Sequence, residues 1–148
     1  MSSQIISQQR TYKVNMAAHN ELGNWGEQIA ADFLESKGWY IRHHDWEYGN
    51  NCHGLVCIDS DMTVLLFVIV CTQKESLKKI TNDIVSAASD YVREYHLEHL
   101  AVRFDRLIIT GTNDNDVITH EENVLPTIDS YSFYEEFRNK QQVIEKLN

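Results

Sequence analysis

Hydrophobic residues recur at helical spacing in the first patterned part of the chain. Leu22, Trp25, Ile29 and Phe33 fall on one face of a helix, and Gly38 follows them as a natural helix stop. This pattern predicts an amphipathic helix over residues 21–37.

Three β-prone segments follow this helix. Residues 39–46 precede a turn-rich stretch, residues 55–58 form a short apolar segment, and residues 63–71 form a nearly unbroken apolar run. Such a run is typical of a strand that is buried on both faces. The polar residues 59–62 predict a turn, so 55–58 and 63–71 are expected to pair as an antiparallel hairpin.

A second helical pattern occupies residues 77–95, about five turns, with Ser76 available as its N-cap. Residues 101–110 then predict another strand. A polar turn separates this strand from a short strand over residues 117–120.

The predicted order is α-β-β-β-α-β-β-α. The Ser- and Gln-rich residues 1–15 are expected to be an N-terminal extension, and 16–126 a single domain. Residues 127–148 are expected to be a C-terminal helical extension, because Ser132 and Glu135 fit a capping box.

Composition narrows the function classes. The chain has 13 basic and 22 acidic residues, and its net charge of -9 disfavours tight binding to phosphate backbones. The start shows no charged-then-apolar leader, and the longest apolar run, 64–71, is too short to span a bilayer. We therefore expect a cytoplasmic protein with no membrane association, and its three cysteines indicate reduced thiols.

Two segments carry a family resemblance. The sequence MAAHNELGNWGEQIAADFLESKGWYI from Met16 follows the pattern LG-x-x-GE-x-x-A-x-x-x-L-x-x-x-G, and RFDRLIITG from Arg103 is similar to an RFD-plus-apolar strand. Both patterns resemble the YraN-like family of bacterial proteins. The matching positions of the first pattern are Leu22, Gly23, Gly26, Glu27, Ala30, Leu34 and Gly38. The resemblance implies an α/β, restriction-endonuclease-like core (α-β-β-β-α-β), with a central mixed sheet flanked by helices.

Nucleases of this fold place an acid on the second strand and a Glu-x-Lys pair on the third, in the family pattern GEIDLI and FVEVK. Two carboxylates hold a divalent cation through oxygen ligands, and the lysine stabilises the attacking water or the developing charge. Residues two apart on a strand share a face, so this spacing directs all these groups to one spot.

This chain resembles a degenerate member of that family. The alignment puts Gly54 and Val56 at the two acidic positions of the second strand, Ile69 at the glutamate and Cys71 at the lysine. Of the expected catalytic site only Glu27 remains. We expect Val56, Ile69 and Cys71 to be mostly buried on one face of the sheet, facing the first helix.

Two metal sites remain as alternatives. A relocated magnesium site could draw on acids outside the family positions, although strand alternation points Asp59 away from the old site. These acids, with Glu27, are Asp45, Glu47, Asp59 and Asp61. A zinc site could use cysteines and histidines, but their spacing is poor and free cysteines in apolar strands usually act as small hydrophobes. The zinc candidates are His43, His44, Cys52, His53, Cys57 and Cys71.

Two surface features could bind partners. Lys74, Lys78 and Lys79 with Arg42 could form a basic patch, although lysines at a helix start usually form a solvated face. The aromatic residues of 131–137 could dock on a partner, although packing onto the core is the default.

Two functional hypotheses follow. The first is a nuclease fold that has lost catalysis and needs no cofactor, and that acts through protein association or serves no retained enzymatic role. The second is a metal-dependent endonuclease that uses a relocated magnesium site on DNA or RNA. The sequence leaves the partner and the oligomeric state open.

Overall fold

The computed structural model describes residues 19–49, 53–73, 76–77, 81–112, 115–126 and 133–135. The predicted extension over residues 1–15 lies outside the described residues. So does most of the predicted C-terminal helix, of which only the helical residues 133–135 are described.

The order of elements follows the sequence prediction. The elements are α2 (His19–Ser36), β1 (Tyr40–Glu47), β2 (His53–Ile58), β3 (Val64–Cys71), α3 (Thr81–Tyr95), β4 (Ala101–Thr112) and β5 (Asn115–Glu121). The first six form the predicted α-β-β-β-α-β core, and β5 extends it.

Helix α2 ends at the predicted stop. The amides of Gly38 and Trp39 donate to carbonyl oxygens of the last helical turn, at Glu35 and Leu34. Gly38 has a φ of 96°, a left-handed conformation that a residue without a Cβ adopts at no steric cost. The chain can therefore reverse sharply into β1.

The five strands form one mixed sheet in the order β1-β2-β3-β4-β5. Strands β3 and β4 are parallel and the other neighbours are antiparallel, so α3 is the crossover between parallel strands. The predicted hairpin between β2 and β3 is confirmed. Its turn is closed by the Asp59 carboxylate, which accepts hydrogen bonds from the backbone amides of Thr63 and Val64.

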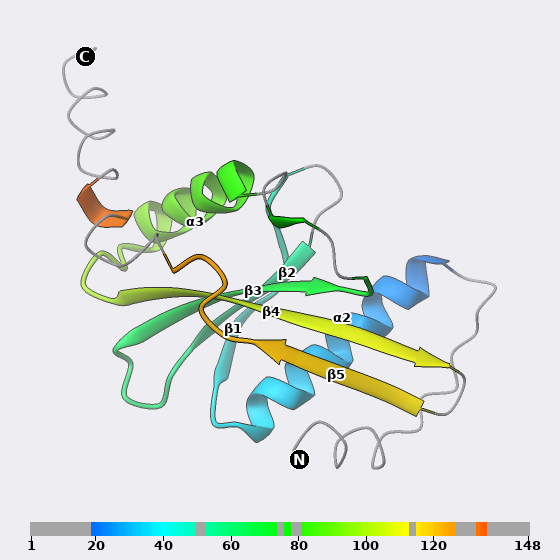
Figure 1. The fold of residues 1–148 in the computed structure, drawn as a ribbon. Helices are drawn as coiled ribbons and strands as arrows, with labels where there is room; N and C mark the ends of the chain where they lie inside the picture. Colours follow the sequence, from blue (N-terminus) through cyan, green and yellow to red (C-terminus); the bar gives the residue numbers. More distant parts are fainter. Residues whose placement is uncertain are drawn as a thin grey trace.

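One helix covers each face of the sheet (Figure 1). On β3, Phe67 packs in the cluster with α3, whereas Leu66 and Val68 pack in the cluster with α2. All three side chains are fully buried. The prediction of burial on both faces is confirmed for residues 65–69, the central part of the predicted range 63–71.

The structure differs from the prediction at the ends of several elements. The β4–β5 pairing continues to Thr112 and Asn115, so both strands are longer than predicted, because the polar residues near the turn join the ladder. Helix α3 is described from Thr81, so Ser76 does not directly precede it, and residues 78–80 lie outside the described residues.

Within the described residues, no helix combines the length and hydrophobicity needed to cross a bilayer.

Truncation of Phe67 tests the α3-side core. Its ring is fully buried and lies 4.9 Å from Trp46 and 5.5 Å from Phe104, measured between ring centroids. We expect Phe67→Ala to lower the free energy of unfolding by about 3–5 kcal/mol in urea titrations. Met62→Ala is the control, because Met62 is 66% exposed and its loss should change stability by about 0.5 kcal/mol or less. Equal effects of the two substitutions would contradict this packing.

Candidate functional site

The positions that align with catalytic residues lie together on β2 and β3. Gly54 pairs with Ile69, and Val56 pairs with Phe67 across the two strands. Val56 is fully buried and Ile69 is 3% exposed. The prediction of one buried face is confirmed for Val56 and Ile69, whereas Cys71 is only half-buried.

The helix that this face contacts was predicted wrongly. Val56 and Ile69 belong to the cluster that contains Ile84, Ala88 and Tyr91 of α3, not to the cluster around α2. Strand alternation groups residues on a face but does not say which helix covers it. That assignment depends on how the chain crosses the sheet.

Cys71 lies at the end of β3 and is half-buried. Its thiol contacts the Leu107 carbonyl oxygen on the neighbouring strand, with the sulfur and oxygen 3.8 Å apart. A thiol is a weak donor, and it carries no positive charge where the family has a lysine.

Aromatic side chains occupy the space beside these positions. Trp46 and Tyr48 at the end of β1 lie with their ring centroids 5.2 Å apart, and Tyr91 of α3 packs edge-on to Phe67. Buried aromatic pairs of this kind add about 0.5–1.5 kcal/mol each beyond their area. This side of the sheet is therefore part of the core.

Gly54 fits only as glycine. A Cβ at this position would overlap the carbonyl oxygen of Val68 and would lie 3.2 Å from the Tyr48 ring. The position that aligns with a family glutamate therefore has no room for any side chain.

A polar network ties the edge strand β1 to α3. The Tyr91 hydroxyl lies 2.6 Å from His43 Nδ1 and accepts a hydrogen bond from Arg42 Nε at 3.0 Å. The Tyr95 hydroxyl lies 3.3 Å from His43 Nε2. Burial raises the pKa of the Tyr91 hydroxyl, which keeps it neutral as a bridge between the two elements.

Glu27 lies on α2, where this helix meets β1. A bulge in β1 gives Asp45 a φ of 53° and turns its amide to donate a hydrogen bond to the Glu27 carboxylate. Burial raises the pKa of Glu27, and the charge of Asp45 adds to that effect, while the amide hydrogen bond opposes it. His44 Nδ1 lies 3.9 Å from Glu27 Oε1.

The surface near Glu27 is hollowed. A cavity of about 410 Å³ is lined by Glu27, Gln28, His44 and Asp45. The Asp45 carboxylate lies 2.6 Å from His53 Nδ1 at the start of β2.

The other acids of the proposed magnesium set do not join Glu27 and Asp45 in this lining. Asp59 closes the β2–β3 turn, and its carboxylate also accepts a hydrogen bond from the Thr63 hydroxyl at 2.7 Å. Glu47 and Asp61 are exposed.

The zinc candidates do not converge within the described part of the chain. Cys57 is fully buried, and burial raises the pKa of its thiol, which fits the expected role of a small hydrophobe. His43 contacts the tyrosines of α3, whereas His44 and His53 each face a carboxylate. Cys52 lies outside the described residues.

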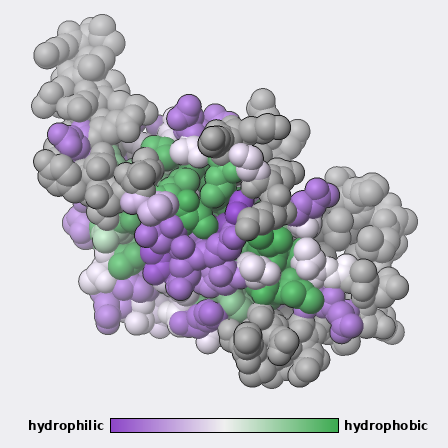
Figure 2. Space-filling view, in the orientation of Figure 1, coloured by the Kyte–Doolittle hydropathy of each residue, from purple (hydrophilic) through white to green (hydrophobic). Residues whose placement is uncertain are grey.

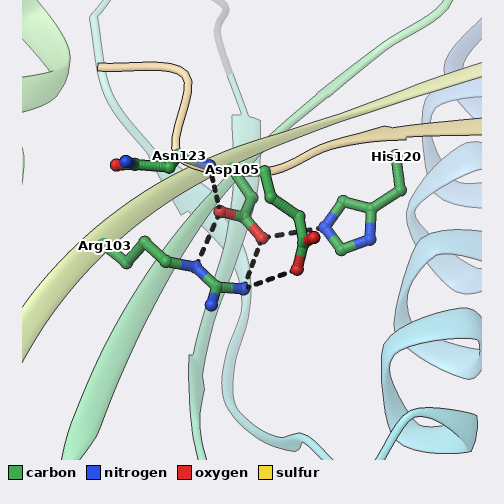
Figure 3. Close-up of polar contacts among 5 residues, drawn as sticks. Arg103, Asp105, His120 and Asn123 are labelled. Carbon is green, nitrogen blue, oxygen red and sulfur yellow. Dashed lines mark hydrogen bonds and ion pairs between the residues drawn. The ribbon is translucent and has the colours of Figure 1, made fainter. Parts of the chain in front are cut away.

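Sequence reasoning missed a cluster around Asp105 of β4 (Figure 3). The buried Asp105 carboxylate accepts hydrogen bonds from Arg103 at 2.8 and 3.0 Å and from the Asn123 amide at 2.9 Å, and it lies 2.8 Å from His120 Nε2. Burial alone would raise the pKa of Asp105, but these contacts outweigh it and lower the pKa. Glu122 also contacts Arg103, at 3.5 Å.

Three potential ligand atoms of this cluster, from Asp105, His120 and Glu122, lie within 4.8 Å of one another. The Arg103 guanidinium already bridges the two carboxylates and supplies the positive charge that a cation would bring. We therefore interpret the cluster as a structural tie between β4, β5 and the segment after β5. The sequence signal was an Arg-Phe-Asp triplet in an apolar strand.

The basic-patch and aromatic predictions are only partly within the described residues. Lys74, Lys78 and Lys79 lie outside them, and the Arg42 guanidinium packs against the Tyr95 ring at 5.5 Å. Phe133 is 3% exposed and packs in the α3-side core, and the Tyr134 hydroxyl donates to the carbonyl oxygens of Leu97 and Leu100. The default interpretation, packing onto the core, is confirmed for these two aromatic residues.

Comparison with known proteins places the chain among bacterial relatives. A UPF0102 protein of Bacteroides thetaiotaomicron is 34% identical over 113 residues, which cover 71% of this chain and 92% of that protein. A UPF0102 protein of Phocaeicola vulgatus is 33% identical over 124 residues, 76% of this chain and 99% of that protein. One of Porphyromonas gingivalis is 32% identical, over 76% of this chain and 90% of that protein. No family model matches the chain.

The two helices around a mixed five-stranded sheet define an α/β protein consistent with a restriction-endonuclease-like core. The relatives identify the family of this chain, whereas the fold identifies only its structural class. The chain belongs to the UPF0102, or YraN, family, as the glycine and RFD patterns indicated.

Alanine at two glycines tests the close approach at Gly54. We expect Gly54→Ala to lower the free energy of unfolding by about 2 kcal/mol or more, because the added Cβ meets backbone. Gly26→Ala is the matched control, since Gly26 lies inside α2 with nothing within 4 Å of an added Cβ. That substitution should stabilise the protein by about 0.5–1 kcal/mol. A neutral Gly54→Ala in urea unfolding would contradict the packing.

The contribution of the Asp105 cluster to the stability of the protein should be lost in acid. Because its pKa is lowered in the folded state, Asp105 stabilises the protein fully above its unfolded value of about 3.9, and this contribution is lost as the pH falls through the folded pKa. At pH 7 we expect Asp105→Asn to cost about 3 kcal/mol in urea unfolding. Below pH 4 the difference from wild type should shrink. The exposed Asp61→Asn is the control, and a pH-independent cost at Asp105 would refute the assignment.

Proposed function

We propose that this chain is a nuclease-fold protein without nuclease chemistry, which acts by binding a partner. The observation that carries the proposal is the burial of Val56 and Ile69 in an aromatic core, at the positions where the family pattern has acids. Phe67 and Tyr91 pack against each other there, with ring centroids 5.8 Å apart. A side chain held in such packing cannot contact a phosphodiester.

The residues at these positions do not fit a catalytic divalent cation. Mg²⁺ prefers oxygen ligands, and Gly54, Val56 and Ile69 have no side-chain oxygen. Cys71 offers one sulfur, which suits softer metals. We therefore derive no metal-dependent step at this face of the sheet.

Charge favours a protein over a nucleic acid as the partner. The net charge of -9 repels phosphate backbones at a distance. Arg103 and Arg106, the two basic residues of β4, are already paired with Asp105 and Glu121. These two arginines are therefore less available to contact the phosphates of a duplex.

One observation favours the alternative, a metal-dependent endonuclease with a relocated site on DNA or RNA. Glu27 and Asp45 line the same cavity, and Mg²⁺ can bind through one or two carboxylates when substrate phosphates complete its ligand shell. The Asp45 amide and His53 already interact with these carboxylates, which lowers their availability. The activity assay below separates the two functions.

Metal-dependent cleavage is the direct test. Catalytic metal ions contribute several kcal/mol to such reactions, and each 1.36 kcal/mol is about tenfold in rate. We expect the purified protein to cleave neither single-stranded, duplex nor branched DNA, nor RNA, with Mg²⁺ or Mn²⁺. Calorimetry at millimolar metal should detect no binding.

Two variants make the cleavage result interpretable. The triple change Val56→Asp, Ile69→Glu and Cys71→Lys restores the aligned catalytic groups, and we expect it to unfold the domain rather than to bind metal, because it buries charge in an apolar core. Glu27→Ala tests the alternative. Wild-type cleavage that disappears both with EDTA and with Glu27→Ala would overturn the proposal and establish a relocated site.

A further inference from the structure

The two edge strands of the sheet, β1 and β5, differ in how well their backbones are protected against pairing with a further strand. Strand β1 carries register irregularities on both sides of His43, and Asp45 has a positive φ. Such bulges prevent an edge from pairing with a further strand. Strand β5 is regular, because it pairs with β4 through seven successive residue pairs without a break. Among the described residues, β5 pairs with no strand other than β4.

Strand β5 also presents residues that favour strand pairing. Val117 is 49% exposed, and Thr119 is exposed on the same face. Both are β-branched. The strand NDVITHE has no proline or lysine, which proteins use to block an edge, and its acidic residues are the inward-pointing Asp116 and the half-buried Glu121. Figure 2 shows hydrophobic residues at the surface along part of β5.

We propose that β5 pairs antiparallel with β5 of a second copy of this chain, about a two-fold axis through Ile118. The two sheets then form one continuous sheet across the dimer. A two-fold axis uses the same strand twice, so one regular edge without a bulge per copy is sufficient. This inference does not rest on the proposed function.

The residue pairing selects this register. Opposed residues in an antiparallel pair point to the same face, so a two-fold axis has to pass through a residue rather than between two. With Ile118 at the centre, all seven residues of β5 find a partner. The pairs are Val117 with Thr119, Asp116 with His120, and Asn115 with Glu121.

The charges of the paired residues favour the register centred on Ile118 over the register centred on Thr119. With Ile118 at the centre, the Asp116 carboxylate faces an imidazole and Glu121 faces an amide. A shift that puts Thr119 at the centre places Asp116 opposite Glu122, and like charges directly opposite each other destabilise a pair. Each copy carries a net charge of -9, so the two copies repel at long range, and salt should strengthen the dimer.

Light scattering after size exclusion tests the association. At a concentration of tens of micromolar in physiological salt, we expect a dimer population that grows with protein and salt concentration. Val117→Glu should abolish it, because the new carboxylate lies diagonally opposite Glu121 of the second copy. Thr110→Glu is the matched control, since Thr110 pairs with Val117 but lies one strand inside the edge. A monomeric wild type, or a dimer that survives Val117→Glu, overturns the proposal.

Disulfide trapping tests the register. In this arrangement residue 117 of one copy faces residue 119 of the other, whereas like residues lie diagonally about 7–8 Å apart, too far for a disulfide. Oxidation of mixed Val117→Cys and Thr119→Cys proteins should give covalent dimers at least severalfold more efficiently than either variant alone. Wild type under the same oxidation controls for the native cysteines. Equal crosslinking of each variant alone and of the mixture overturns this register.

Discussion

The Val68 carbonyl oxygen and the Tyr48 ring approach the β2 backbone closely at Gly54, and this contact constrains the packing of the side chains around it. Without a Cβ at this position, the Val68 carbonyl and the Tyr48 ring can close over β2. Tyr48 then packs against Trp46, and Trp46 against Phe67, so a row of rings continues from the edge strand to the centre of the sheet. Any side chain at 54 would force these groups apart.

This packing connects the fold to its proposed loss of chemistry. A catalytic metal site needs charged side chains around a space open to solvent, whereas this row of rings needs the same space filled and dry. Burial of Val56 and Ile69 therefore stabilises the domain in the place where acids would require ligands and water. Polar interactions lie elsewhere, in the Asp105 cluster and where the Tyr91 hydroxyl joins β1 to α3.

Local patterns predicted most of the fold. Gly38 ended α2, and the short turn at Asp59 specified the β2–β3 hairpin, because both signals lie within a few residues of the structure they determine. The face of the sheet that holds Val56 was assigned to the wrong helix. Strand periodicity is the same for either face, and only the crossover through α3 decides which helix covers it.

The candidate site was less predictable because its contacts join distant residues. Asp105 and its neighbour Arg103 were visible in the RFD motif, but His120 and Asn123, 15 and 18 residues away, complete the cluster. The hydrogen bond from Asp45 to Glu27 depends on a bulge in β1 that no hydrophobic pattern marks. Family alignment located the replaced positions, but not the tyrosine rings that lie beside them.

Anomalous diffraction from crystals grown with Mn²⁺ tests the central claim most directly. If the aligned catalytic face is a packed core, the anomalous map contains no manganese between β2 and β3 beside Gly54, Val56 and Ile69, and the Tyr48 and Phe67 rings occupy that space. A manganese ion bound there, with these rings displaced, would contradict the account.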